Sequence, residues 1–515
     1  MTEQPATTNP TGPADPHPAT DATTEEFADW RRLHPLTPAV AGTYLLGLAV
    51  LTAAILIYRS VPGWIIWLSV LPLPILVTLY EWLRLRTTRF RVAGGRFELH
   101  TGVLFRSRRS VALDRIRNVD ATAEPVGRMY GLTGLRIGTG ENASDSEALA
   151  LSPLGRAEAE RLRASLLPRR AEATDSPEIA SWTPSWIRFA PFSFTTPLLG
   201  LAAFGAVYEG LDILGVDMDR QVIPDLVGRL ADFPLPLVIG ALLLALLVIG
   251  TLGSVLVYAE TWWRHRLTED SEALHVRRGL LTTRNITLER KRVLGVEVRE
   301  PLSLRWAKGA SVEAVATGLG SPEDEQNSAR GTLLPPTGNG LAWPVAARVL
   351  RRSAFPIDAA ELSPHPRIAR RRRLGWAVGW VAAPTALLVG LGLLLTDVLI
   401  HIGWLFAVVA LPIAVLLALD AYRNLGHGLD PEFLVSRKGS ASRHTTVLRR
   451  TDIIGWTIRR SPFQRRHGLI TLSATIAGGT GAYRIPDADQ DEGVELADHA
   501  LPDLVAPFLV DTKRD

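Results

Sequence analysis

Six long apolar stretches limit what this chain can fold into more than any other feature. A bilayer core is about 30 Å thick, so a helix that spans it needs roughly 20 mostly apolar residues. Residues 237–258 contain no charged side chain at all. Stretches that meet or approach the required length occur at 39–58, 62–83, 196–216, 235–258, 375–396 and 402–419. The chain is therefore predicted to be an integral membrane protein with six transmembrane helices arranged as three pairs.

Basic residues near the ends of these stretches indicate their orientation, because arginine and lysine favour the cytoplasmic side of a membrane. The links inside each pair are short and much less basic, such as the acidic stretch around Asp217 and Asp219. Each pair is thus predicted to be a hairpin that enters and leaves from the cytoplasm. Both termini and all large soluble segments should lie on that side of the cell membrane. The basic flanks are Arg31, Arg32, Arg84, Arg86, Arg89, Arg91, Arg264, Arg266, Arg367, Arg370, Arg371, Arg372, Arg373 and Arg423.

Residues 1–34 are predicted to be a disordered tail, because they are rich in Thr, Pro, Ala and acids and hold too little apolar surface to fold. A cleavable signal peptide would begin with a basic region and a short apolar stretch, and the tail has neither. The first apolar helix is therefore expected to remain as an anchor.

Composition argues against several classes of function. The chain has no cysteine, which excludes disulfides, thiolate zinc sites, iron–sulfur clusters and cysteine nucleophiles. The net charge is +4, but only Lys291, Lys308, Lys438 and Lys513 are lysines, and an excess of arginine with Ala, Gly and Leu is typical of a GC-rich genome. The glycine-rich stretches 138–140 and 478–481 precede no helix, so they predict hairpin turns and not phosphate loops. No nucleic-acid partner, cofactor, metal site or enzymatic activity is predicted.

A repeated pattern follows the three hairpins, which are placed at 35–86, 190–261 and 374–421. Three soluble segments, 87–170, 262–360 and 422–511, each begin with a run in which apolar and polar residues alternate, and each run ends in glycine. Alternation that ends in glycine is typical of a strand running into a turn. The turn glycines are Gly102, Gly279 and Gly439, followed by strands predicted at 110–113, 285–288 and 444–448 and then at 116–119, 293–298 and 453–458.

The second half of each segment repeats too. Pro125, Pro301 and Pro462 follow the turn glycines by 23, 22 and 23 residues. Gly131, Gly309 and Gly468 come next, each before another strand, and amphipathic helices are predicted at 157–167, 344–351 and 494–509. Three matches in the same order indicate a triplicated unit of hairpin, small β-rich domain and terminal helix.

This arrangement resembles the YdbT-like bacterial membrane proteins, whose soluble units are bacterial pleckstrin-homology-like (PH-like) domains of the short, membrane-linked class. The repeated Gly, Pro and Gly positions carry the match, together with Glu124-Pro125 and Glu300-Pro301, over roughly residues 35–511. The third unit departs from it with Ser461 before the proline. The resemblance implies three β-rich domains, each a barrel or sandwich closed by a C-terminal helix, and it implies no reaction. It suggests a role in envelope maintenance or stress resistance, with a smaller one-unit PH-like membrane protein as a candidate partner.

Cationic residues around the three glycine turns are the candidate binding residues. Cations beside a membrane attract anionic lipid headgroups, and PH-like domains often bind ligands at such a turn. The alternative interpretation is a solvated basic flank that topology alone requires. The candidates are Arg106, Arg108 and Arg109 in the first unit, Arg277, Arg278 and Arg284 in the second, and Arg437, Lys438 and Arg443 in the third.

Glu209 and Asp212 lie three residues apart in the third apolar stretch, hence on one helix face. Charged residues inside a membrane are rare and often functional. Their position near the outer end favours an interfacial structural role. The leading prediction is a non-enzymatic membrane protein whose PH-like domains dock lipid headgroups, one another or a partner protein. The alternative is a transporter or export component that uses these two acids.

Overall fold

The computed structural model describes residues 27–58, 62–102, 106–113, 116, 118–138, 149–166, 177–192, 196–213, 228–229, 232–317, 331–356 and 362–502. Within these residues, five helices are long and apolar enough to cross a membrane. A sixth span is present if η2 (Pro184–Phe192) and α7 (Thr196–Ile213), which meet at an 80° bend, count as one. The predicted set of six helices therefore corresponds to five or six in the structure.

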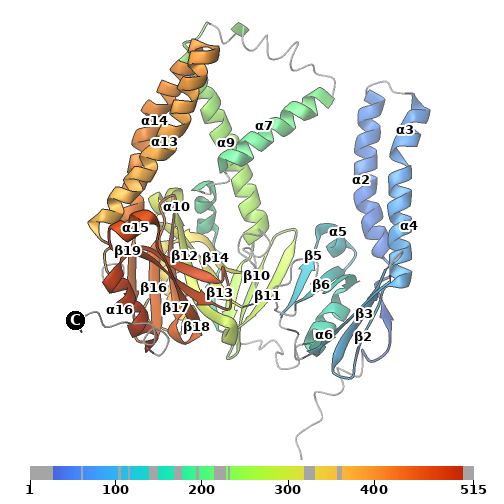
Figure 1. The fold of residues 1–515 in the computed structure, drawn as a ribbon. Coiled ribbons are helices and arrows are strands. Elements are labelled where there is room, and N and C mark those ends of the chain that lie inside the picture. Colours follow the sequence, from blue (N-terminus) through green and yellow to red (C-terminus); the bar gives the residue numbers. More distant parts are fainter. Residues whose placement is uncertain are drawn as a thin grey trace, which may run out of the picture.

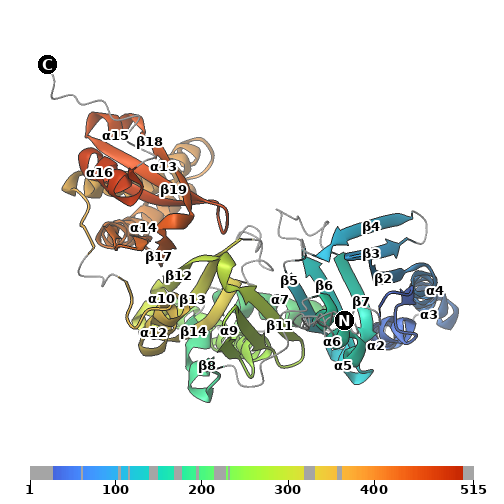
Figure 2. The same ribbon diagram turned by 90° about the horizontal axis from the view of Figure 1, so that it is seen from below.

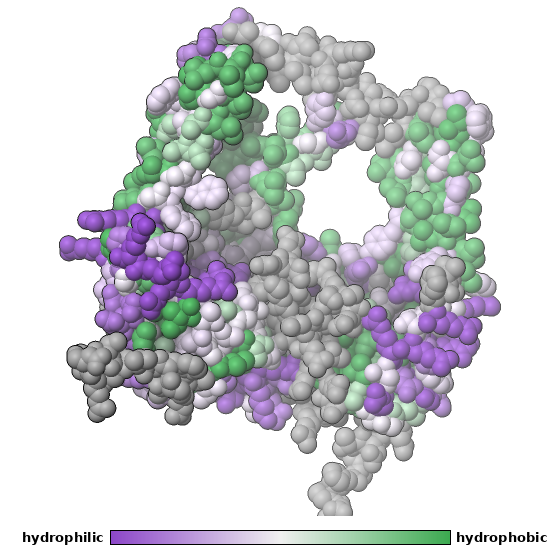
Figure 3. All heavy atoms as spheres, viewed as in Figure 1, coloured by the Kyte–Doolittle hydropathy of each residue, from purple (hydrophilic) through white to green (hydrophobic). Residues whose placement is uncertain are grey.

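The spanning helices form three hairpins that rise from the same side of the β-rich domains (Figure 1). The first contains α2 (Thr37–Tyr58), α3 (Gly63–Val70) and α4 (Pro72–Thr87), and the other two pair α7 with α9 (Leu235–Trp262) and α13 (Arg367–Leu395) with α14 (Asp397–Arg423). Apolar side chains cover these helices and hydrophilic ones gather on the domains below (Figure 3). This separation is the one that a bilayer around the helices requires.

Domain 1 consists of a four-stranded antiparallel sheet, a second group of three antiparallel strands and a closing helix. The first sheet contains β1 (Arg31–Arg32), β2 (Arg89–Ala93), β3 (Arg96–Thr101) and β4 (Ser107–Ala112), and the second strand group contains β5 (Asn118–Ala123), β6 (Leu132–Gly138) and β7 (Leu149–Gly155). The short helix α5 (Pro125–Met129) and the closing helix α6 (Arg156–Leu166) follow β5 and β7. Alternation sets the inward face, since Phe97 and Leu99 of β3 are buried in a core shared with Leu162 of α6.

Domains 2 and 3 repeat this order. Domain 2 contains β8 (Glu178–Ser181), β9 (Arg266–Glu269), β10 (Ala273–Arg278), β11 (Thr283–Glu289), β12 (Val293–Pro301), α10 (Leu302–Trp306), β13 (Gly309–Ala316), β14 (Thr332–Gly338) and α12 (Asn339–Val349). Domain 3 contains β15 (Gly426–Leu429), β16 (Phe433–Lys438), β17 (Ser442–Arg449), β18 (Ile453–Arg459), α15 (Pro462–Arg466), β19 (Leu469–Ile476), β20 (Ala482–Asp489) and α16 (Gln490–Ala500). Domain 1 has its own hydrophobic core, whereas the cores of domains 2 and 3 share residues across their boundary, such as Phe433 in the core of domain 2 and Leu294 in the core of domain 3.

The sheets continue from one domain into the next. β5 of domain 1 pairs antiparallel with β11 of domain 2, which gives a seven-stranded sheet in the order β7-β6-β5-β11-β10-β9-β8. β12 of domain 2 pairs in the same way with β17 of domain 3 in the six-stranded sheet β14-β13-β12-β17-β16-β15. Figure 2 shows the resulting bent row of three domains. Backbone hydrogen bonds therefore join domains that the sequence suggests are separate units.

Each hairpin is inserted between two neighbouring strands. The segment before the hairpin pairs with the strand after it, as β1 does with β2 and β8 with β9, and Ser363 makes the equivalent bridge to His427 of β15. Phe27 is fully buried, and its carbonyl accepts a 2.7 Å hydrogen bond from the Val92 amide. Residues 27–34 thus belong to the folded domain, although the sequence places them in a disordered tail, and residues 1–26 lie outside the described residues.

The strands predicted on both sides of each turn are present, but each unit contains more. β2, β9 and β15 follow the hairpins directly and were not predicted, and neither were the last strands β7, β14 and β20. The helix predicted at 344–351 begins at Asn339 and contains Pro344. The helix predicted at 494–509 is α16, which begins at Gln490 and ends at Ala500.

Candidate functional site

The candidate cations surround a tight turn that only glycine can make. Gly279 and Gly439 have φ of +111° and +103°, and a Cβ atom at either would lie 1.9 Å from the carbonyl oxygen of Thr282 or Ser442. Gly102 has φ of +127°. This backbone is the left-handed region that side chains disfavour. The three turns therefore deliver β4, β11 and β17 in the same register.

The first cluster lies on an open strand. Arg108 and Arg109 are exposed residues of β4, opposite His100 and Leu99 of β3, and Arg106 is exposed immediately before the strand. Within the part of the chain that the structure describes, β4 pairs with β3 alone. The three predicted residues thus form a cationic edge of domain 1.

The second cluster is divided. Arg277 is exposed, whereas Arg278 is 1 % exposed with its guanidinium 4.0 Å from the ring centre of Trp262. Burial, and then the neighbouring charge of Arg284, lower the pKa of Arg278 to about 9. Arg284 is exposed on β11 but sits opposite Thr122 of domain 1. These three cations therefore do not form one surface.

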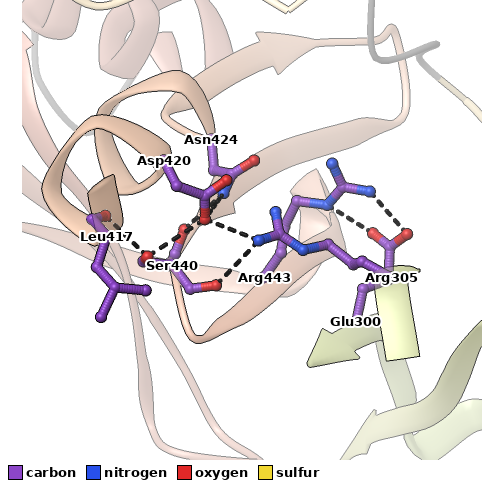
Figure 4. Close-up of polar contacts among 8 residues, drawn as sticks. Glu300, Arg305, Leu417, Asp420, Asn424, Ser440 and Arg443 are labelled. Atoms are coloured by element: carbon purple, nitrogen blue, oxygen red, sulfur yellow. Dashed lines mark hydrogen bonds and ion pairs between the residues drawn. The ribbon is translucent and has the colours of Figure 1, made fainter. Parts of the chain in front are cut away.

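The third cluster is half-buried and partly used within the protein. Burial lowers the pKa of both Arg437 and Lys438. Arg443 Nε and Nη2 each donate a 2.7 Å hydrogen bond to one carboxylate oxygen of Glu300 (Figure 4). Glu300 is 1 % exposed and belongs to β12, so this bidentate pair joins domain 3 to domain 2.

The same junction is tied to the membrane hairpin (Figure 4). Asp420, in the last turns of α14, accepts a 2.7 Å hydrogen bond from Arg305 of α10 in domain 2. Its carboxylate also accepts from the Ser440 hydroxyl at 3.2 Å and the Asn424 amide at 3.0 Å. Domain 2, domain 3 and the base of the third hairpin therefore meet at one polar network.

A second set of ionisable groups lies on the β12–β13–β17 sheet. Arg299 donates to Glu297 at 2.7 Å and pairs with Glu313 at 2.8 Å, and His444 Nδ1 lies 2.8 Å from Glu297. Burial disfavours the charge of Glu297, but the hydrogen bond from His444 and the charge of Arg299 outweigh it and lower its pKa to about 2. Burial raises the pKa of Glu313 to about 7, with Glu297 adding to the rise and Arg299 opposing it. The pKa values of these two neighbouring carboxyl groups are therefore shifted in opposite directions.

Asp487 ties domain 3 to the start of α13. It is 1 % exposed, has φ of +63°, and pairs with Arg372 and, at 3.4 Å, with Arg373. Gln464 donates to the same carboxylate at 2.9 Å, and His365 Nδ1 lies 3.1 Å from the Asp487 carbonyl oxygen. The arginines that predict cytoplasmic flanks thus also fix the hairpin to its domain.

A cavity of about 600 Å³ lies at the base of the first hairpin. Helices α2 and α4, the β5–β6–β7 strands and β11 of domain 2 supply its walls. Arg84, Arg136 and Arg284 line it together with Glu81 and Glu124. Arg84 donates to Glu81 at 3.1 Å and to the Ser152 carbonyl at 3.2 Å. The cavity gathers cationic groups where α4 leaves the predicted membrane region.

The two acids predicted in the third apolar stretch, Glu209 and Asp212, belong to α7. Glu209 is an exposed residue of α7, and the side chain of Asp212 lies outside the described residues. The transporter interpretation stays a prediction. Among the residues that the structure describes, no three His, Asp or Glu side chains are grouped as a metal site would require.

Sequence reasoning missed the acids that organise the junctions. In the sequence, Glu300 stands out only as part of a repeated Glu-Pro pair, although it is the acid before Pro301 that Arg443 binds. Asp420 and Asp487 carry no local motif, since their arginine partners Arg305 and Arg372 are more than a hundred residues away. A charged residue directly after an apolar stretch was the only signal for Asp420.

A comparison with protein-family models agrees with the triplication. The model described as "Bacterial PH domain" matches residues 40–170, 222–332 and 385–503, each including part of a hairpin and all or most of the domain that follows; the second match ends where β14 begins. No curated protein and no solved structure matches the chain.

Proposed function

This chain belongs to the bacterial PH domain family, and from that premise we propose that it is a non-enzymatic integral membrane protein whose three PH-like domains act together as one docking platform at the membrane surface. Continuity of the sheets between domains carries the proposal. Domains joined through β5–β11 and β12–β17 move as a unit, and their hairpins leave on the same side (Figure 1). A row held in this way presents several binding surfaces to the membrane at once, which raises avidity.

We place the platform on the cytoplasmic side of the cell membrane. Arginines at the helix bases support this orientation, among them Arg84 and Arg86 in the last turn of α4 and Arg372 and Arg373 in the first turns of α13. Anionic lipid headgroups are the ligand class that such a surface attracts, at about 1 kcal/mol per basic residue near the membrane. A role in envelope maintenance or stress resistance, with a smaller PH-like membrane protein as partner, is part of the proposal through the family resemblance.

The arrangement of the platform is tested with cysteine pairs, because the chain has no cysteine of its own. Ala121 and Asn285 face each other between β5 and β11, so A121C/N285C should form a disulfide in native membranes. Cleavage at a protease site inserted at 167–176 would separate domain 1 from the rest of the chain unless that disulfide holds the two halves together. The pair A123C/N285C, displaced by two residues, serves as the control. Halves that separate in both variants would contradict a shared sheet.

Lipid binding is tested on the full chain in detergent by native mass spectrometry with added phosphatidylglycerol. The variant R106Q/R108Q should bind this lipid about thirtyfold more weakly, since two exposed cations worth about 1 kcal/mol each are lost. The variant R156Q/R161Q removes the same charge from exposed positions on α6 and should bind as the parent does. Equal binding by all three proteins would contradict the lipid part of the proposal.

A further inference from the structure

The two junctions between domains follow one rule of register. In each, the strand before the short helix of one domain pairs with the strand after the glycine turn of the next domain. The residue just before the helix N-cap lies opposite the fourth residue after the turn glycine. These facing pairs are Ala123 with Thr283 and Glu300 with Arg443.

At the two ends of the row, the equivalent strands have no neighbouring domain to pair with. These are the strand after the glycine turn of domain 1, β4, and the strand before the short helix of domain 3, β18. Among the described strands, β4 pairs only with β3 and β18 only with β19. β4 is the equivalent of β11 and β17, and four of its residues, from Ser107 to Ser110, are exposed. An uncovered edge presents unpaired backbone N–H and C=O groups that template the addition of a strand.

The charges at the open ends disfavour pairing between copies of this chain. The position four residues after Gly102 is Arg106, and the residue before the N-cap Ser461 is Arg460. If β18 of one copy were added to β4 of another in the register of the two junctions, Arg460 would lie opposite Arg106, and Arg459 would follow opposite Ser107. Like charges directly opposite each other destabilise a sheet.

We propose that the β4 edge is a docking site for the edge strand of a different protein's PH-like domain, and that this strand carries a carboxylate opposite Arg106. The two junctions of this chain supply the pattern. Where the position holds Thr283, the facing residue is the neutral Ala123, and where it holds Arg443, the facing residue is Glu300 with two 2.7 Å hydrogen bonds. We therefore expect the residue that faces Arg106 to be acidic. A hairpin of the partner would leave on the membrane side, as the three hairpins of this row do (Figure 1).

This inference rests on the proposed platform and names a partner for its exposed cationic edge. The test makes the chain itself supply the acidic strand. In the full-length variant R460E, β18 carries the carboxylate that would face Arg106. Molecules of this variant should associate head to tail at concentrations about tenfold or more below those that the parent needs. The reason is that a bidentate charged pair replaces the repulsion between Arg460 and Arg106. The reciprocal variant R106E, with Arg460 intact, should associate equally, whereas R106E/R460E should not.

Register is read from disulfides in the R460E background. S107C/R459C should give covalent oligomers in membranes, and S110C/R459C, three residues out of register, should not. Association that persists in R106E/R460E, or charge swaps that leave both single variants monomeric, would overturn the inference. Monomeric variants together with loss of phosphatidylglycerol binding in R106Q/R108Q would instead assign this edge to lipid and leave the platform standing. Intact lipid binding with a failed A121C/N285C disulfide would count against the platform alone.

Discussion

Arg443 and Glu300 face each other across the boundary between two domains, 143 residues apart in the chain, and share two hydrogen bonds of 2.7 Å. The carboxylate is almost completely buried and the arginine is about a quarter exposed. The pair lies in the pairing of β12 with β17, at the point where α10 begins and close to the base of α14. It therefore joins domain 2 to domain 3 beside the Arg305–Asp420 pair, which links domain 2 to the third hairpin (Figure 4).

Removing one partner of the Arg443–Glu300 pair should lower the stability of the folded protein. E300A leaves the Arg443 guanidinium without its acid in a mostly buried place, and we expect a loss of about 3 kcal/mol of stability. The unfolding temperature in detergent, followed by tryptophan fluorescence, measures it. E300Q/R443Q should recover most of the loss, since no buried charge remains. E160Q removes an exposed i,i+4 pair with Arg156 and should change stability by less than about 0.5 kcal/mol. Equal effects of E300A and E160Q would contradict the structural role.

Asp487 should control how firmly the third hairpin is held. D487N keeps a residue type that tolerates positive φ but removes the charge that faces Arg372 and Arg373. We expect it to weaken the contact by about 1–3 kcal/mol and to speed amide hydrogen exchange in the first turns of α13. The exposed Glu495 of α16 provides the control E495Q. Unchanged exchange in D487N would show that the hairpin is held by other contacts.

The predictions that depend on local pattern succeeded. Five of the six apolar stretches became helices long and apolar enough to span a membrane, and the stretch at 196–216 became α7, which does so only together with η2. Alternation ending in Gly279 or Gly439 became β10–β11 and β16–β17 because a turn and its two strands are contiguous in the chain. The sequence does not predict β9 and β15, because each has only four residues. The sequence of β15, Gly-His-Gly-Leu, is also poor in residues that favour strands.

The predictions that depend on distant partners could not be made. Nothing near β5 or β12 indicates that their free edges meet β11 and β17, since strand edges carry no sequence label. The nine candidate cations were grouped by their distance from a glycine, yet Arg278 is buried under Trp262 and Arg443 is occupied by Glu300. Whether the remaining cations bind a ligand stays a prediction, and contacts elsewhere in the fold decide which of the nine stay exposed.

Acid should destabilise domain 3 through two buried histidines. His365 and His427 are in contact, with ring nitrogens 3.2 Å apart. Burial, and then the neighbouring His427, lower the pKa of His365 to about 4, and burial lowers the pKa of His427 although Glu492 opposes it. The folded state therefore binds fewer protons than the unfolded state. Their contribution to stability is full above pH 6.5 and is lost as the pH falls toward 4.

The change in unfolding temperature between pH 7 and pH 4.5 measures this effect. Glu313 acts in the opposite sense. Because its pKa in the folded protein is raised to about 7, its protonation as the pH falls favours the folded state. The comparison is therefore made between variants. H427Q should show a smaller drop on acidification than the parent, and H499Q, which alters an exposed histidine, should show the same drop. An equal drop in H427Q would place the acid sensitivity elsewhere.

The sidedness of the hairpins can be determined with single cysteines in this cysteine-free chain. Thr396 lies between α13 and α14 at the end away from the domains, and Thr480 lies in the turn between β19 and β20, both exposed. The arginines at the helix bases predict domains in the cytoplasm. An impermeant maleimide should therefore label T396C in intact cells and T480C only after the membrane is opened. Labelling of T480C in intact cells would reverse the orientation, and the cationic edge of β4 would then face the outer leaflet.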